Sequence, residues 1–187
     1  MRGPHRPPAQ YAPVDWLNYD RHGSFFDLRG QSYLACNDQS GPRQSPLFRN
    51  SVLCYAHYRT DGTIEPLKLT AMGVGRHDAR LGIPAIEYSG IENGRKDWAE
   101  NMPSIVLHQD GRLEFDRVSG LGSTMSLYGT SASAGSSIDV LIDGHRVVDT
   151  QMNADRADVV LRSVNKAARL TLITRKGTVR LTKIVSS

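Results

Sequence analysis

Short runs rich in Phe, Tyr, Leu and Val recur along this chain, separated by turn-forming residues, and predict an all-β fold. In the first part of the chain these runs span residues 24–28, 31–36 and 51–58, with Gly, Asp, Asn and Pro between them. The Asp61-Gly62 pair that follows favours a hairpin turn, because glycine adopts positive φ without steric cost. No stretch sustains the periodicity of an amphipathic helix, so very little helix is expected.

A second series of predicted strands begins near Ile83 and continues to the end of the sequence. Apolar and polar residues alternate clearly within 138–142 and 170–173, as on strands that bury one face. The runs follow one another at intervals of about ten residues, which is typical of a sandwich or barrel. They cover residues 85–88, 104–108, 112–115, 124–128, 137–142, 145–150, 158–161, 168–174 and 178–185.

Changes in composition divide the chain into four parts. Residues 1–19 are rich in proline, which favours an extended conformation, and are interpreted as a tail or a connection. Residues 20–70 hold the first strands. The pattern then fades through several glycines, so residues 71–82 are interpreted as a linker. Residues 83–187 form the second unit, for which a β-sandwich is expected.

The composition excludes several classes of function. The chain has a net charge of +4, but its arginines are scattered among carboxylates, whereas nucleic-acid binding needs basic residues clustered on one surface. No apolar run approaches the ~20 residues that a membrane helix needs. We therefore expect neither a nucleic-acid partner nor a membrane partner. Residues 1–10 lack the apolar core of a signal peptide, so none is predicted.

The two cysteines, Cys36 and Cys54, each fall within a predicted strand. One pair in a chain of this length does not make a disulfide framework, so two buried free thiols are the simpler interpretation. A cross-strand disulfide stays open if the two strands are neighbours.

The region from Asp20 to Pro66 carries an ordered set of landmarks. His22 precedes an aromatic strand, Gly30 begins a turn into the next strand, Arg49 opens the third, and an Asp-Gly-Thr-Ile turn ends it. In this order the region resembles the last blade of the five-bladed propeller of glycoside hydrolase family 43, whose members cleave arabinose- or xylose-containing plant polysaccharides. A whole propeller is not present, so we expect a partial blade of three to four antiparallel strands.

This resemblance implies roles for two residues and excludes others. His22 corresponds to a histidine in the axial channel, where members hold calcium or water, and Arg49 to an arginine that hydrogen-bonds the sugar. A strand histidine held by hydrogen bonds and a solvated arginine are the alternatives. Glycoside hydrolysis needs two carboxyl groups, which family members carry on earlier blades. The family's catalytic motifs do not include four aspartates in the first part of the chain: Asp15, Asp20, Asp27 and Asp38.

The second unit carries three further motifs: Ile86-Glu87 at the entry strand, the run DGRLEFDRV at 110–118, and SSIDVLIDG at 136–144. Together they resemble a family 6 carbohydrate-binding module, a β-sandwich of the jelly-roll type. Such modules stack an aromatic ring on a sugar face, so the candidates are Trp98, in the polar loop 94–101, Tyr88 and Tyr128. The alternative for each ring is a core or loop-anchoring role.

Many members of that family also hold a structural calcium ion. Ser89 and Thr182 stand where carboxylates are common, and calcium needs six to eight oxygens, largely carboxylate. We therefore expect no metal cofactor in the jelly roll, and a calcium ion near His22 only in a complete propeller.

The sequence thus predicts a carbohydrate-binding C-terminal segment of a plant-polysaccharide hydrolase that lacks the catalytic carboxylates and is inactive alone. Its expected partners are a plant cell-wall oligo- or polysaccharide and the missing N-terminal blades, and the parent enzyme is expected to be secreted or periplasmic. Two alternatives stay open. The chain could be active once completed by an upstream chain, or the sandwich could brace the propeller without binding sugar.

Overall fold

The computed structural model describes residues 23–38, 50–67, 73–99, 102–131, 135–152, 155–161, 164 and 166–187. Within these ranges the chain forms strands and no helix, which confirms the predicted all-β class. The described residues accordingly include no helix long and apolar enough to cross a membrane.

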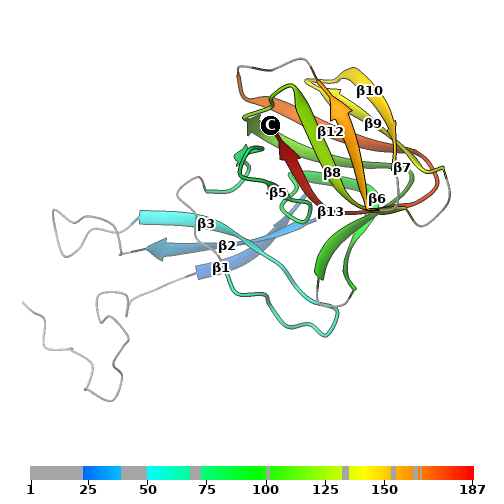
Figure 1. Cartoon of the computed structure of the whole chain (residues 1–187). Coiled ribbons are helices and arrows are strands. Elements are labelled where there is room, and N and C mark those ends of the chain that lie inside the picture. The colour runs from blue at the N-terminus through cyan, green and yellow to red at the C-terminus, as the bar shows by residue number, and fades with distance from the viewer. Residues whose placement is uncertain are drawn as a thin grey trace, which may run out of the picture.

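The first unit is an antiparallel sheet of three strands in the order β1-β2-β3. The strands are β1 (Gly23–Leu28), β2 (Gln31–Asp38) and β3 (Asn50–Ala56). Arg29 and Gly30, with φ of 51° and 75°, make the two-residue turn between β1 and β2. The sheet projects from one side of the larger unit (Figure 1). Three antiparallel strands agree with the expected partial blade, but membership of a propeller stays a prediction.

The second unit is a β-sandwich whose strands follow the order β10-β9-β12-β7-β13-β8-β11, with β6 and β4 on β7 and β5 on β13. It is built from β4 (His77–Asp78), β5 (Ile83–Pro84), β6 (Gly90–Ala99), β7 (Met102–Ser119), β8 (Thr124–Ser131), β9 (Ser137–Ile142), β10 (His145–Gln151), β11 (Arg156–Val160), β12 (Ala168–Lys176) and β13 (Val179–Ser186).

Strand β7 differs from the prediction, because the expected strands 104–108 and 112–115 are one continuous strand. Its first half pairs with β13 and its second half with β12, so it passes from one layer of the sandwich to the other. The crossing occurs at a bulge, where residues 108–111 lie opposite Asn93 of β6. Gly111 permits it, since a Cβ there would lie 2.7 Å from the carbonyl oxygens of Asn93 and His108.

The hydrophobic core lies between the two layers of the sandwich. Alternate residues of each strand point inward, as the pattern of buried and exposed residues on β11 and β13 shows. Leu113, Phe115, Leu170 and Leu172 are fully buried in it, and each such side chain contributes ~1.5–3 kcal/mol by leaving water. No described residue of β1, β2 or β3 belongs to this cluster.

The two cysteines lie on neighbouring strands in a diagonal relation. Leu34 pairs with Cys54, and Cys36 pairs with Val52 two residues further along. Both thiols are free. Cys54 is buried, and this burial raises the pKa of its thiol, which disfavours the reactive thiolate form.

Candidate functional site

A group of buried polar side chains joins the three-stranded sheet to the jelly roll. Gln31 of β2 is fully buried, and its Nε2 donates a hydrogen bond of 2.7 Å to the carbonyl oxygen of Ile86. Its Oε1 accepts a hydrogen bond from Nζ of Lys96 on β6. The same Nζ lies 3.4 Å from Nδ1 of His57 and 5.4 Å from the centroid of the Tyr88 ring. Burial lowers the pKa of Lys96 to about 8, because it disfavours the ammonium form.

A ladder of rings crosses the same junction. The Tyr33 and Tyr55 centroids are 5.5 Å apart, Tyr55 and His77 are 6.4 Å apart, and His77 meets the core residue Phe115 edge-on at 5.7 Å. The Tyr55 hydroxyl accepts a hydrogen bond of 2.9 Å from the Gly75 amide. His77 is buried, and this burial lowers its pKa to about 4. The ladder therefore holds a neutral imidazole between the two units.

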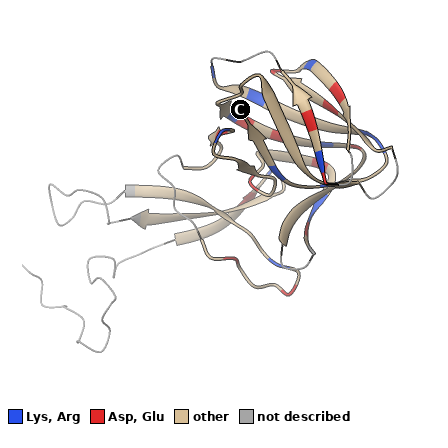
Figure 2. Cartoon of the chain, viewed as in Figure 1, with Lys and Arg blue, Asp and Glu red and all other residues tan. Residues whose placement is uncertain are grey.

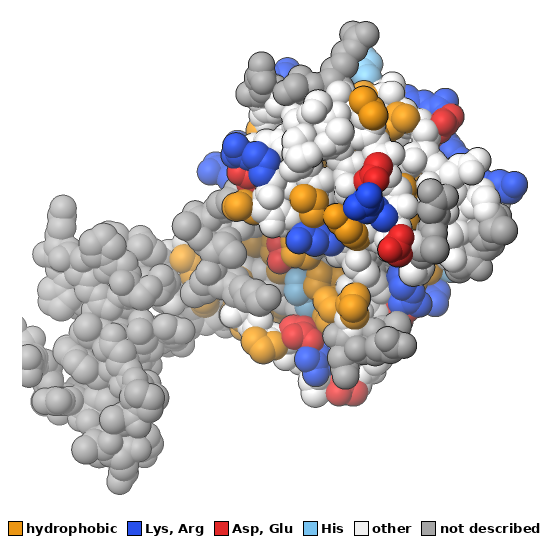
Figure 3. Space-filling model, in the orientation of Figure 1, with side chains coloured by type: hydrophobic (Ala, Val, Ile, Leu, Met, Phe, Trp, Pro, Cys, Tyr) orange, Lys and Arg blue, Asp and Glu red, His pale blue; other side chains and the backbone are white. Residues whose placement is uncertain are grey.

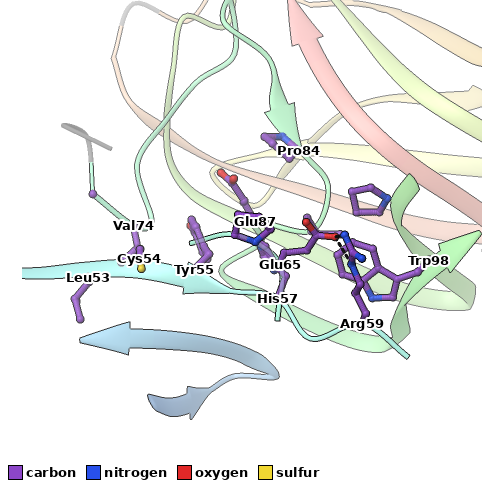
Figure 4. A pocket seen from close by; sticks show the side chains of 14 residues that line it. Leu53, Cys54, Tyr55, His57, Arg59, Glu65, Val74, Pro84, Glu87 and Trp98 are labelled. Carbon is purple, nitrogen blue, oxygen red and sulfur yellow. Dashed lines mark hydrogen bonds and ion pairs between the residues drawn. The ribbon is translucent and has the colours of Figure 1, made fainter. Parts of the chain in front are cut away.

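Beside these contacts lies a pocket of about 410 Å³, within the range of small-molecule sites (Figure 4). Residues of β3 and of the loop after it form one wall. The jelly roll forms the other with Pro84, Ile86, Glu87, Trp98 and Pro103. Figure 3 shows hydrophobic side chains gathered at this junction with charged side chains around them. The pocket thus combines apolar walls with a few polar groups.

The loop after β3 is a tight hairpin, which confirms the predicted Asp61-Gly62 turn. Asp61 Oδ1 accepts hydrogen bonds from the amide and hydroxyl of Thr63, and Gly62 has a φ of 83°. The hairpin places Arg59 and Glu65 side by side on the pocket wall, where Nε and Nη2 of Arg59 both lie 2.5 Å from Oε1 of Glu65.

Trp98 belongs to strand β6, so the prediction that residues 94–101 form a loop was wrong for 94–99. The backbone pairing of β6 with β7 continues as far as Ala99, which pairs with Met102, so the turn of this hairpin begins only after Ala99. The indole is half-buried, packs against the jelly-roll core and lines the pocket. Its Nε1 donates a hydrogen bond of 2.9 Å to the carbonyl oxygen of Tyr58. The ring is therefore fixed in place by both units.

The other two predicted aromatic contacts lie elsewhere. Tyr88 is only 2% exposed and its hydroxyl donates to the carbonyl oxygen of Gly30, so its ring is part of the junction and does not line the pocket. Tyr128 lies half-buried on β8, where it is hydrogen-bonded to Arg156. The three rings do not form one site.

The residues assigned from the propeller resemblance can be followed only in part. His22 and Arg49 lie outside the described residues, as do Asp15, Asp20 and the side chain of Asp38. Asp27 lies on β1, and its Oδ1 accepts a hydrogen bond of 2.5 Å from Ser32. The implied roles of His22 and Arg49 therefore stay predictions.

The described residues include no group of three His, Cys, Asp or Glu side chains that could hold a metal ion. Ser89 and Thr182 are the two positions where the resemblance led us to expect calcium carboxylates, and both hydroxyls contact protein. The Ser89 hydroxyl accepts from the Asp116 amide at 2.9 Å, and the Thr182 hydroxyl donates to the Tyr128 carbonyl at 3.2 Å. This chemistry does not fit a calcium site, and the expected absence of the ion stays a prediction.

A second polar surface covers the outer face of β9, β10 and β12. Asp139 is only 3% exposed there. Its Oδ2 lies 2.7 Å from Nε of Arg175, and its Oδ1 lies 2.9 Å from Nη2 of Arg146. The second contact is an ion pair without hydrogen-bond geometry. Figure 2 shows charges of both signs interspersed over the strands of the jelly roll. The described groove beside Asp139 has no aromatic side chain in its wall. The pocket at Trp98 is therefore the better candidate for a ligand site.

Comparisons with known proteins bear on the fold. No family model matches the sequence, and no curated protein matches it. The structure is similar to a family 6 carbohydrate-binding module whose binding sub-sites were dissected crystallographically, with a TM-score of 0.53 and 15% identity over 60% of this chain and 96% of that one. The second unit has this jelly-roll fold.

Two further modules of that family give the same result. The module from Clostridium stercorarium in complex with cellobiose has a TM-score of 0.52 and 11% identity, over 60% of this chain and 98% of that one. The module from Clostridium cellulolyticum in complex with xylose has a TM-score of 0.52 and 16% identity, over 59% and 98%. At these identities the similarity concerns the fold, and it confirms the predicted jelly roll.

Proposed function

We propose that this protein binds carbohydrate and that the pocket at Trp98 is its binding site. One observation carries this proposal: a fixed indole lines a concave pocket whose rim holds Arg59, Glu65 and His57. Sugars bind where an aromatic ring can stack on their apolar face while polar side chains reach their hydroxyls. The fold supports the proposal, because solved modules of the same fold contain cellobiose and xylose.

The finer proposal is that the chain belongs to a family 43 hydrolase acting on plant arabinosides or xylosides. In it the three-stranded sheet serves as the last blade, Arg49 and His22 contact the substrate, and catalysis comes from blades outside this chain. The exposed apolar side chains of β1 support a further packing partner there, since Phe25, Phe26 and Leu28 are 47%, 40% and 57% exposed. We expect the parent enzyme to be secreted or periplasmic.

A second candidate function is a structural brace without sugar binding. It is favoured by the same junction, because Gln31 and Lys96 join the jelly roll to the three-stranded sheet and Trp98 joins it to the hairpin after β3. The two candidates differ in what a saccharide does to the protein, and one experiment separates them.

Xylo-, arabino- and cello-oligosaccharides are titrated calorimetrically into the full chain and into Trp98→Ala, Trp98→Phe and Tyr128→Ala. Stacking contributes on the order of 1 kcal/mol, so Trp98→Ala should weaken binding about fivefold or more. Trp98→Phe keeps a ring and should weaken it less, whereas Tyr128→Ala should match the wild type. Melting temperatures check the folding of each variant. If no saccharide binds the folded wild type, the brace is the correct function.

A further inference from the structure

We infer that the saccharide site is composite: the hairpin 57–65 forms its recognition wall against Trp98, and the pair of Arg59 and Glu65 restricts it to uncharged sugars. This inference rests on the proposed function and deepens it. A site carried by the jelly roll alone, as in a self-sufficient module, would need no contribution from residues that precede the sandwich in sequence.

The hairpin has a fixed shape. The Glu65 amide donates a hydrogen bond of 2.9 Å to the His57 carbonyl, and the Arg59 amide donates one of 2.8 Å to the Thr63 carbonyl. Tyr58 and Ile64 form an isolated antiparallel bridge between these bonds. Side chains on such a hairpin are positioned before a ligand arrives, which lowers the entropic cost of binding.

The hairpin and the indole form one unit. The hydrogen bond from Trp98 Nε1 to the Tyr58 carbonyl joins β6 to the hairpin between His57 and Arg59. This bond uses the only polar group of the indole, so the ring can offer a ligand only its apolar surface. The side chains of the pocket lining that can recognise hydroxyls are then mainly on the hairpin, at His57, Arg59 and Glu65, with Glu87 on the facing wall.

The ion pair of Arg59 and Glu65 on the hairpin suits a ligand that carries hydroxyl groups. Arg59 directs Nε and Nη2 at a single oxygen of Glu65. Both contacts use Oε1 of Glu65, so among the described residues Nη1 of Arg59 and Oε2 of Glu65 stay available as a donor group and an acceptor side by side. A sugar diol offers the complementary acceptor and donor.

The same pair of charges disfavours a ligand that carries a carboxylate. The positive charge of Arg59 is already compensated by Glu65, and Glu87 adds a second carboxylate to the facing wall. Lys96 lies behind His57 with its Nζ directed to Gln31, so it faces the junction. A uronic acid would lose hydration without gaining an unpaired cation, which is unfavourable in a partly buried pocket.

The test compares neutral and charged saccharides on four forms of the full chain: wild type, Arg59→Ala, Glu65→Gln and Arg80→Ala. Arg80 is the matched control, since it forms an exposed ion pair of 2.6 Å with Asp78 and does not line the pocket. Xylotriose, arabinotriose, cellotriose and trigalacturonic acid are titrated into each, with melting temperatures as the folding check.

We expect a neutral trisaccharide to bind the wild type at least tenfold more tightly than trigalacturonic acid. Arg59→Ala should weaken neutral binding about tenfold, as for the loss of a hydrogen-bonded charged group worth ~1.5 kcal/mol, while Arg80→Ala should leave it unchanged. Glu65→Gln should raise the affinity for trigalacturonic acid several-fold, because it removes the carboxylate that pairs directly with Arg59.

Each of the other possible results of this experiment contradicts a specific part of the proposal. Equal neutral binding by wild type and Arg59→Ala overturns the composite site but leaves carbohydrate binding intact. Tighter binding of trigalacturonic acid by the wild type overturns the selectivity for uncharged sugars. If the wild type binds none of the four saccharides, both the proposed function and this inference are wrong.

Discussion

The jelly roll and the three-stranded sheet of this protein differ in how much apolar surface they bury. The jelly roll surrounds a continuous core that begins at Ala79 and includes the inward faces of its strands. The three-stranded sheet buries little, and all six residues of β1 are exposed. An isolated sheet of this size is marginal in water. We therefore expect the smaller sheet to depend on the larger unit far more than the larger unit depends on it.

This asymmetry places the candidate site at the weaker contact. The pocket has one wall from each unit, and the junction that holds the walls together consists of a few polar and aromatic contacts around Gln31, Lys96 and His77. Polar contacts of this kind stabilise the folded state less than burial of the core does. Removing only one partner is nevertheless costly, because the other partner is left buried without a hydrogen bond. Conditions that weaken the junction should thus affect the pocket before they unfold the jelly roll.

The largest expected effect comes from the core. Phe115→Ala should lower the free energy of unfolding by about 3–5 kcal/mol, because it removes a fully buried ring. The matched change Phe25→Ala on β1 should cost about 1 kcal/mol or less, since that ring is 47% exposed. Urea unfolding followed by far-ultraviolet circular dichroism measures both. Equal losses for the two variants would contradict the asymmetry.

A smaller effect should follow from acid. His77 has a folded pKa of about 4 against an ordinary 6.5, so the fold favours the neutral ring. The stability due to the neutral ring is complete above pH 6.5 and is lost as the pH falls towards 4, by at most about 1.4 kcal/mol per pH unit. Urea midpoints between pH 7 and 4 measure the slope. His77→Gln should flatten it, whereas His145→Gln, at an exposed position, should not; identical slopes would exclude His77 as the cause.

The smallest of these effects should be local to the junction. Gln31→Leu removes the donor to the Ile86 carbonyl and one acceptor of the Lys96 ammonium, at a cost of about 1–3 kcal/mol. Hydrogen exchange should increase in β2, β3 and the hairpin 57–65, while the jelly-roll strands keep their protection. Gln151→Leu, on the exposed face of β10, is the control and should leave exchange unchanged. Uniform loss of protection across both sheets would show instead that they unfold together.

Much of the fold was predictable because strand patterning is local. Alternation within 138–142 and 170–173 predicted strands that bury one face, and the structure places Ile138, Val140, Leu170 and Leu172 in the core. The Asp61-Gly62 pair predicted its turn from backbone sterics alone. Trp98 was also identified as a candidate from the sequence, although its assignment to a loop was wrong, because hydrogen bonds to β7 extend β6 through a polar segment.

The site itself was decided by the tertiary structure. Sequence reasoning missed Arg59, Glu65 and Lys96, although the hairpin turn between the first two was a usable signal of their proximity. Nothing local could show that Gln31 meets Lys96, since 65 positions separate them. Periodicity records which face of a strand is buried, but it does not record which distant strand covers that face. The sequence alone therefore determined most of the strands and the Asp61-Gly62 turn, and its motifs indicated the jelly roll, whereas the docking of the two sheets determined the pocket.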